Sequence, residues 1–142
     1  MKYLASLCLL APLYGCVGTV QSYSGEPRAI NKVSVVRGVI TEFAGSNYHT
    51  FFASYAPFVP GKKPEFQNVG DAFVGYPREL HMAPGSYLLL TRCHIGNQYA
   101  FPSVHLDAVE GMTHEIICEP VSDELSKVKA TFRKSEKTPA QK

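Results

Sequence analysis

Leu80-His81-Met82-Ala83-Pro84-Gly85-Ser86-Tyr87-Leu88-Leu89-Leu90 places an apolar segment on each side of a Pro-Gly pair. Pro84-Gly85 suits the two central positions of a type II turn, because proline presets φ at the first position and glycine accepts the positive φ of the second. The flanking segments, 78–82 and 86–93, are therefore predicted to be β-strands separated by a turn.

Further strand-like segments occur on both sides of this one. They are rich in β-branched and aromatic residues, and Pro/Gly turns such as Gly96-Asn97 and Glu110-Gly111-Met112 separate them. Gly38 is expected to mark a bulge, and Pro102 interrupts one extended run. Seven or eight short strands with no convincing helix predict an all-β sandwich. The predicted strands are 33–43, 47–55, 72–76, 78–82, 86–93, 100–109, 113–118 and 127–133.

The segment Leu80–Leu90, taken with the sequence up to Cys118, resembles the strand, Pro-Gly, Tyr, strand signature of PEGA-like and transthyretin-like modules of bacterial envelope proteins. This resemblance implies a small Ig-like/transthyretin-like sandwich. Because such modules are mostly non-catalytic, it also implies that the chain is not an enzyme.

The first sixteen residues, MKYLASLCLLAPLYGC, combine a positive charge at Lys2, a short apolar run and a small residue before a cysteine. They resemble a bacterial lipoprotein signal peptide with 13–16 as the lipobox. The resemblance implies cleavage before Cys16, acylation of Cys16 with chains such as palmitate, and, with Val17 following, the periplasmic face of the outer membrane. An ordinary signal peptide or a buried N-terminal helix are the alternatives. The run is too short to span a bilayer.

Four segments follow from these assignments: a signal peptide (1–15), the lipidated cysteine with a flexible tether (16–32), the sandwich (33–133) and a disordered basic tail (134–142). The whole chain has 142 residues and a formal net charge of +2. Such a nearly balanced charge argues against nucleic acid as a partner.

Two cysteines remain once Cys8 is removed with the signal peptide and Cys16 is acylated. In an exported chain this pair, Cys93 and Cys118, is expected to form a disulfide, with two buried free thiols as the alternative. A bridge requires that the strands carrying the cysteines are direct neighbours or lie in opposite sheets, because strands two apart exceed the reach of a disulfide. Pro102 is the expected point at which the chain crosses between sheets.

One candidate chemical site is a strand face that would carry His105, Asp107 and Glu115 if the chain formed a hairpin about Gly111. The spacing matches no metal-binding motif, and no G-x-S-x-G element is present. Since a zinc site needs three or four converging ligands, we expect no metal and no cofactor.

Two candidate contact surfaces remain. The loop 57–68 is flanked by aromatic residues that either form a recognition surface or fill the core; they are Phe51, Phe52, Tyr55, Phe58 and Phe66. The basic end, 127–142, has six Lys/Arg against Glu136 alone, and it is either a site for anionic envelope components or a solvated strand face with a soluble tail.

The sequence therefore predicts a membrane-anchored lipoprotein that acts as a non-catalytic binding or scaffolding module of the cell envelope. Its partners would be the membrane, through Cys16, and an envelope protein or peptidoglycan. The alternatives are an accessory subunit of a trans-envelope secretion or assembly complex and, from a different class, an envelope enzyme or metal-binding protein.

Overall fold

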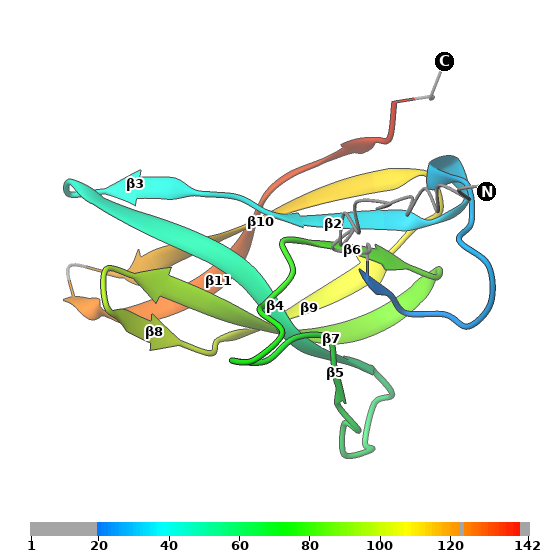
Figure 1. Ribbon diagram of the computed structural model, residues 1–142, viewed down its shortest axis with the longest axis horizontal. Helices are drawn as coiled ribbons and strands as arrows, with labels where there is room; N and C mark the ends of the chain where they lie inside the picture. Colours follow the sequence, from blue (N-terminus) through cyan, green and yellow to red (C-terminus); the bar gives the residue numbers. More distant parts are fainter. Residues whose placement is uncertain (1–19, 123, 140–142) are drawn as a thin grey trace, which may run out of the picture.

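The computed structural model describes residues 20–122 and 124–139, which form two packed β-sheets (Figure 1). These residues contain eleven strands and one short 3₁₀ helix, η1 (Ile30–Lys32). The all-β sandwich predicted from the sequence is confirmed, with more strands than the seven or eight expected. Within the described residues, no helix is long and apolar enough to cross a membrane.

The first sheet has five strands in the order β1-β6-β2-β10-β11, and the second has six, with β3-β4-β7-β8 in order, β5 beside β4 and β9 beside β7. The pairs β1/β6 and β2/β10 are parallel, and all other pairs are antiparallel. The strands are β1 (Val20–Gln21), β2 (Ser34–Gly38), β3 (Thr41–Phe43), β4 (Ser46–Pro57), β5 (Gln67–Asn68), β6 (Glu79–Met82), β7 (Gly85–Ile95), β8 (Gln98–Ala100), β9 (Ser103–Ala108), β10 (Met112–Val121) and β11 (Glu124–Lys137).

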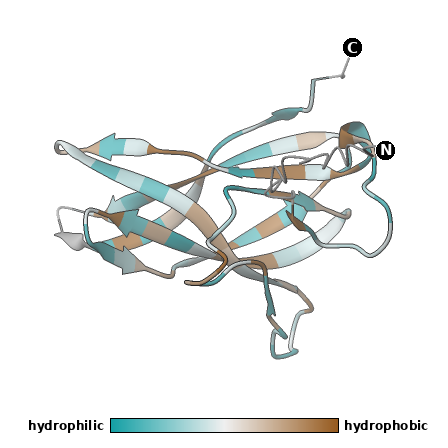
Figure 2. Ribbon diagram, in the orientation of Figure 1, coloured by the Kyte–Doolittle hydropathy of each residue, from teal (hydrophilic) through white to brown (hydrophobic). Residues whose placement is uncertain are grey.

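The core lies between the two sheets and follows the two-residue period of the strands. In β7, Tyr87, Leu89, Thr91 and Cys93 are buried, whereas the residues between them are partly exposed. Figure 2 shows the same alternation of hydrophobic and hydrophilic residues along several strands. A second, smaller cluster at the other end of the sandwich contains Tyr48, Cys93 and Cys118.

Gly38 lies where the chain leaves the first sheet after β2 and enters the second at β3. A Cβ atom on Gly38 would lie 2.3 Å from the carbonyl oxygen of Thr50 in β4, so only glycine allows this approach. The bulge predicted at this position is wrong, because β2 pairs with β6 and β10 without a register shift. The glycine serves a close contact between the sheets.

The disulfide between Cys93 and Cys118 links β7 of the second sheet to β10 of the first, with 5.7 Å between the Cα atoms. The sequence allowed the two cysteines to lie either on neighbouring strands or in opposite sheets, and the structure places them in opposite sheets. Pro102 is not the crossing point, because its carbonyl accepts hydrogen bonds from both the backbone N–H and the hydroxyl of Thr91 in the second sheet. The chain crosses between the sheets after β9, at 109–111.

The Pro84-Gly85 pair also joins the two sheets, since β6 belongs to the first and β7 to the second. The expected type II turn is wrong. The φ angle of Gly85 is 154°, far from the value of about 80° that a type II turn requires at this position. The chain bends at Pro84, and Gly85 already begins β7.

Three further boundaries differ from the prediction. Residues 72–76 are not a strand: an isolated bridge between Asp71 and Gly75 closes a tight turn over 71–75. Val20–Gln21, expected in the tether, pair with Leu80 and His81 of β6. Lys134–Lys137, expected in the tail, continue β11 because they pair with the start of β10.

Replacing both bridging cysteines, Cys93→Ala with Cys118→Ala, is expected to lower the free energy of unfolding by about 3–4 kcal/mol, because the bridge closes a loop across 25 residues. Urea unfolding of the variant, and of the native chain with and without reductant, measures this loss. A native midpoint that reductant does not change would contradict it.

Candidate functional site

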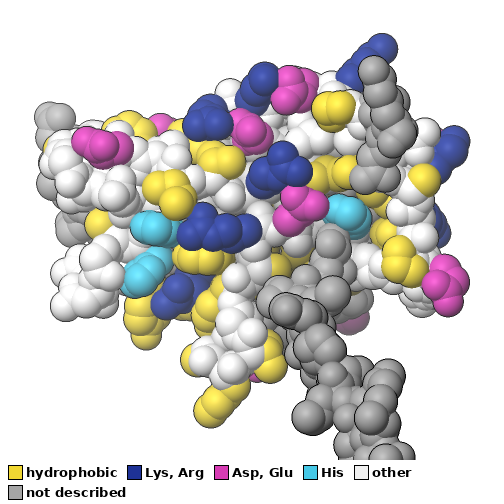
Figure 3. All heavy atoms as spheres, turned by 45° about the horizontal axis from the view of Figure 1, so that its top comes forward, with side chains coloured by type: hydrophobic (Ala, Val, Ile, Leu, Met, Phe, Trp, Pro, Cys, Tyr) yellow, Lys and Arg dark blue, Asp and Glu magenta, His cyan; other side chains and the backbone are white. Residues whose placement is uncertain are grey.

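The outer face of the second sheet carries a cluster of cationic and aromatic side chains, which we call the arginine–aromatic face. Figure 3 shows histidine, Lys/Arg and hydrophobic side chains gathered together on this side of the molecule. Its members come from β4, β7, β8, the residue after β8 and the segment before β6: His49, Phe51, Tyr76, Arg78, Arg92, His94, Tyr99 and Phe101.

Strand register produces this face. His49 pairs with His94, Phe51 pairs with Arg92, and His94 pairs in turn with Tyr99 of β8. Directly opposed residues share one face of a sheet, so these side chains form rows across three strands. Their neighbours Thr50 and Cys93 point inward and are fully buried.

Both arginines of the face lie against aromatic rings. The Arg78 guanidinium carbon is 4.3 Å from the centre of the Phe51 ring. That of Arg92 lies 4.8 Å from the Tyr76 ring and 4.9 Å from the Tyr99 ring. A guanidinium held over aromatic rings keeps its charge, and the stacking fixes the orientation of its plane.

His49 is neutral and has a defined tautomer. Arg78 Nη2 lies 3.0 Å from His49 Nδ1; since arginine can only donate, Nδ1 accepts and the proton is on Nε2. Burial, with added repulsion from Arg78 and His94, holds the pKa of His49 below its usual value of 6.5. The ring therefore presents a hydrogen-bond donor beside Arg78.

Neither Arg78 nor Arg92 forms an ion pair with a carboxylate among the described residues. Two shallow hollows lie on this face: one of about 410 Å³ lined by His49, His94 and their neighbours, and one of about 390 Å³ lined by Arg92, Tyr99 and their neighbours. Tyr99 keeps 61% of its surface exposed. The face thus offers cations without an internal counter-ion next to exposed rings.

The predicted face of His105, Asp107 and Glu115 does not exist. His105 and Asp107 lie on β9 in the second sheet, whereas Glu115 lies on β10 in the first and accepts two hydrogen bonds from Arg133. No hairpin forms about Gly111, and this is why the expected alignment fails. Within 20–122 and 124–139, no three His, Cys, Asp or Glu side chains form a group able to hold a metal.

His105 and Asp107 meet Ser86 instead. The Ser86 hydroxyl lies 2.7 Å from His105 Nε2 and donates to Asp107 Oδ1 at 2.9 Å, and Asp107 is 3.7 Å from that same nitrogen. In a hydrolase triad the carboxylate holds the other ring nitrogen and Nε2 takes the serine proton. Here the serine proton is directed to Asp107, so the geometry does not activate the serine.

The aromatic residues around the loop 57–68 divide between core and surface. Phe52 and Tyr55 are buried, whereas Phe58 and Phe66 are exposed, and the Phe58 ring packs edge-on against His105. Phe51 belongs to the arginine–aromatic face. The loop projects from the body of the sandwich (Figure 1).

The basic end is largely neutralised by neighbouring carboxylates. Lys129 pairs with Glu119, Arg133 with Glu115, and Lys134 with Glu136. The hydrogen bond from Lys134 to Glu136 raises the pKa of this lysine. This end therefore carries less free positive charge than its sequence indicates.

Of the predicted site residues, Cys93 and Cys118 are brought together, and Cys16 lies outside the described residues. The arginine–aromatic face was not predicted from the sequence. The alternation of His49 with Phe51 indicated that both side chains share one face of a strand. The sequence does not give the register of β4 against β7, so it could not show that Arg92 and His94 lie beside them.

No protein-family model matches the chain, and no curated protein or solved structure is significantly similar to it.

His114 of β10 is buried, with 7% of its surface exposed. Its Nδ1 lies 2.8 Å from the Ser135 hydroxyl, whereas its Nε2 has no hydrogen-bond partner in the part of the chain that the structure describes. Burial lowers the pKa of His114. At pH values just below 6.5, the His114 side chain of the unfolded chain therefore binds a proton, whereas that of the folded chain stays neutral.

Stability is accordingly expected to fall as the pH drops from about 7 to about 5.5, and His114→Gln should reduce this dependence. Urea unfolding across this range measures it, with His105→Gln at an exposed position as the matched control. If the free energy of unfolding of His114→Gln depended on pH as steeply as that of the native chain, His114 would not contribute to the pH dependence.

Proposed function

We propose that this chain is a lipid-anchored, non-catalytic binding module of the bacterial cell envelope. Acylated Cys16 attaches it to the periplasmic face of the outer membrane. The lipobox resemblance of 13–16 supports the anchor. The Cys93–Cys118 disulfide supports an oxidising compartment, because such bonds persist in exported proteins.

The observation that carries the binding role is the pair of arginines, Arg78 and Arg92, held on aromatic rings with no carboxylate partner among the described residues. Guanidinium groups match carboxylate and phosphate with two parallel hydrogen bonds. The exposed ring of Tyr99 beside them offers apolar contact. This combination suits an anionic group carried on a sugar.

Two envelope components present that chemistry: peptidoglycan, through its carboxylates, and phosphorylated glycolipid headgroups. Both would be recognised by the same atoms, so the ligand is defined here as an anionic glycan and the experiment distinguishes the two sources.

The loop 57–68 favours a second candidate function, that of an accessory subunit in a trans-envelope secretion or assembly complex. Phe58, Val59 and Phe66 are exposed on it, and a hollow lined by Lys62, Lys63 and others lies beside them. Exposed apolar residues on a projecting loop are a common contact for a protein partner.

Lipidation is tested by labelling cells with radioactive palmitate. The wild-type chain is expected to be labelled and Cys16→Ser to lose the label completely, because acylation requires this thiol. Cys8→Ser, within the same apolar run, should keep the label. An unlabelled wild type would overturn the anchor.

Binding is tested with Arg78→Gln and Arg92→Gln combined, titrated with soluble muropeptides and, separately, with a phosphorylated lipid-A-type headgroup. Each lost charged hydrogen bond contributes about 1.5–3 kcal/mol, so affinity for the true ligand should fall at least about tenfold. Lys62→Gln with Lys63→Gln removes the same charge elsewhere and should bind like the wild type.

The ligand whose affinity falls identifies the source. If neither compound binds the wild type, or if the lysine variant loses as much affinity as the arginine variant, the arginine–aromatic face is not the binding site.

A further inference from the structure

A rigid turn, 71–75, displays two apolar side chains. The Asp71 carboxylate accepts hydrogen bonds from the N–H groups of Phe73 at 2.7 Å and Val74 at 2.9 Å. Asp71 and Gly75 also exchange backbone hydrogen bonds, and Gly75 has the positive φ that closes the turn. The N–H groups of Val74 and Phe73 hold the pKa of the Asp71 carboxyl below its usual value.

The tip of this turn is the most exposed apolar feature of the described surface. Phe73 keeps 97% of its surface exposed and Val74 keeps 80%. Apolar surface displayed by an ordered turn marks an interaction site more often than a scattered exposed residue does. The turn holds Phe73 outward when a looser loop would let it fold back onto the protein.

The tip lies beside the start of the described chain. Val74 and Val20 line the same mainly apolar hollow of about 420 Å³, together with Val69, Tyr76 and others. Val20 is fixed there because it pairs with Leu80 of β6. Cys16 precedes Val20 by four positions, which is no more than about 14 Å of fully extended chain.

We propose that Phe73 and Val74 enter the acyl-chain and headgroup boundary of the leaflet that holds the lipid of Cys16. The inference rests on the proposed lipid anchor. An acyl group attached this close to Val20 keeps the tip within reach of the lipid surface. Apolar side chains at such a boundary are buried by about 5–10 Å.

Two points of attachment fix the orientation of the domain on the membrane, whereas one does not. The acylated cysteine alone is a single point of attachment, whereas the tip adds a second contact on the same side. Tyr76, beside the tip, suits the headgroup level, where tyrosine rings are enriched. Gly75 and Tyr76 also line the hollow next to Arg92, so the arginine–aromatic face would lie close to the lipid surface.

The chain contains no tryptophan, so Phe73→Trp introduces a single fluorophore at the tip. The acylated full-length variant is reconstituted into phosphatidylcholine vesicles with and without bromine on the acyl chains. Its emission is expected to be at least about twofold lower in the brominated vesicles, because bromine quenches only fluorophores at acyl-chain depth.

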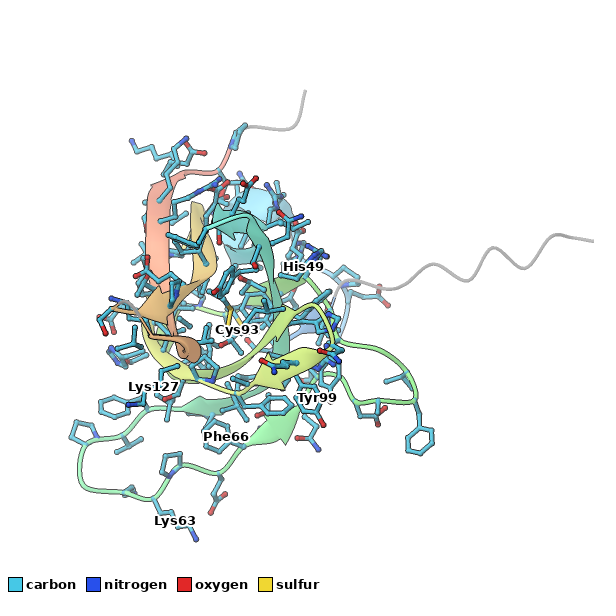
Figure 4. All side chains as sticks on the ribbon, turned by 90° about the vertical axis from the view of Figure 1, so that its left-hand side faces the viewer. His49, Lys63, Phe66, Cys93, Tyr99 and Lys127 are labelled. Atoms are coloured by element: carbon cyan, nitrogen blue, oxygen red, sulfur yellow. A yellow bond between two sulfur atoms is a disulfide. The ribbon has the colours of Figure 1, made fainter. Side chains whose placement is uncertain are left out.

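Phe66→Trp, on the loop that Figure 4 shows with Lys63 and Phe66, is the matched control and should be quenched little. Val74→Trp repeats the test should Phe73→Trp fold poorly. The inference is overturned if the anchored Phe73→Trp and Val74→Trp variants each emit equally in brominated and unbrominated vesicles. Emission that is blue-shifted but unquenched would place the chain's own N-terminal segment or a second copy on the tip, and it overturns the inference too.

Mass spectrometry of the same samples separates the two proposals. A chain without acyl groups that fails to float with the vesicles contradicts the anchor itself. An acylated chain that floats but shows no quenching contradicts only the tip.

Discussion

The close approach of the two sheets at Gly38 and Thr50 is the constraint on which the rest of the structure depends. The Thr50 carbonyl leaves no space for a side chain on Gly38, and the Thr50 hydroxyl accepts the backbone N–H of Cys118 from the opposite sheet. Cys93 pairs with Thr50 and bonds covalently to Cys118. Polar and covalent links thus hold the sheets together at one buried point.

This buried point also determines what faces solvent. Because Thr50 and Cys93 must point inward, their neighbours His49, Phe51 and Arg92 point outward on adjacent strands. A shift of one residue in the register of β4 or β7 would bury these side chains and expose the disulfide. The arginine–aromatic face is therefore a consequence of the core. In Figure 4, His49 and Tyr99 lie on one side of the sandwich and Lys127 on the other.

Local pattern predicted most of the long strands but not their partners. The alternation in 86–93 and the pairing of Cys93 with Cys118 followed from composition and spacing. The crossings between the sheets at Gly38, Pro84-Gly85 and 109–111 did not follow from the sequence, where a bulge, a type II turn and a hairpin were expected. Pairing between β4 and β7 spans 27 intervening residues, and no local rule determines the register of such distant strands. The arginine–aromatic face depends on that register.

The central claim is that the arginine–aromatic face binds an anionic glycan of the envelope. Photocrosslinking in intact cells tests it most directly, with a photoreactive phenylalanine analogue in place of Tyr99 and, as control, of Lys127. The account predicts sugar-bearing adducts from position 99 and none from position 127. Capture of a single abundant protein from position 99, without sugar, would contradict the claim and favour a subunit of an envelope complex.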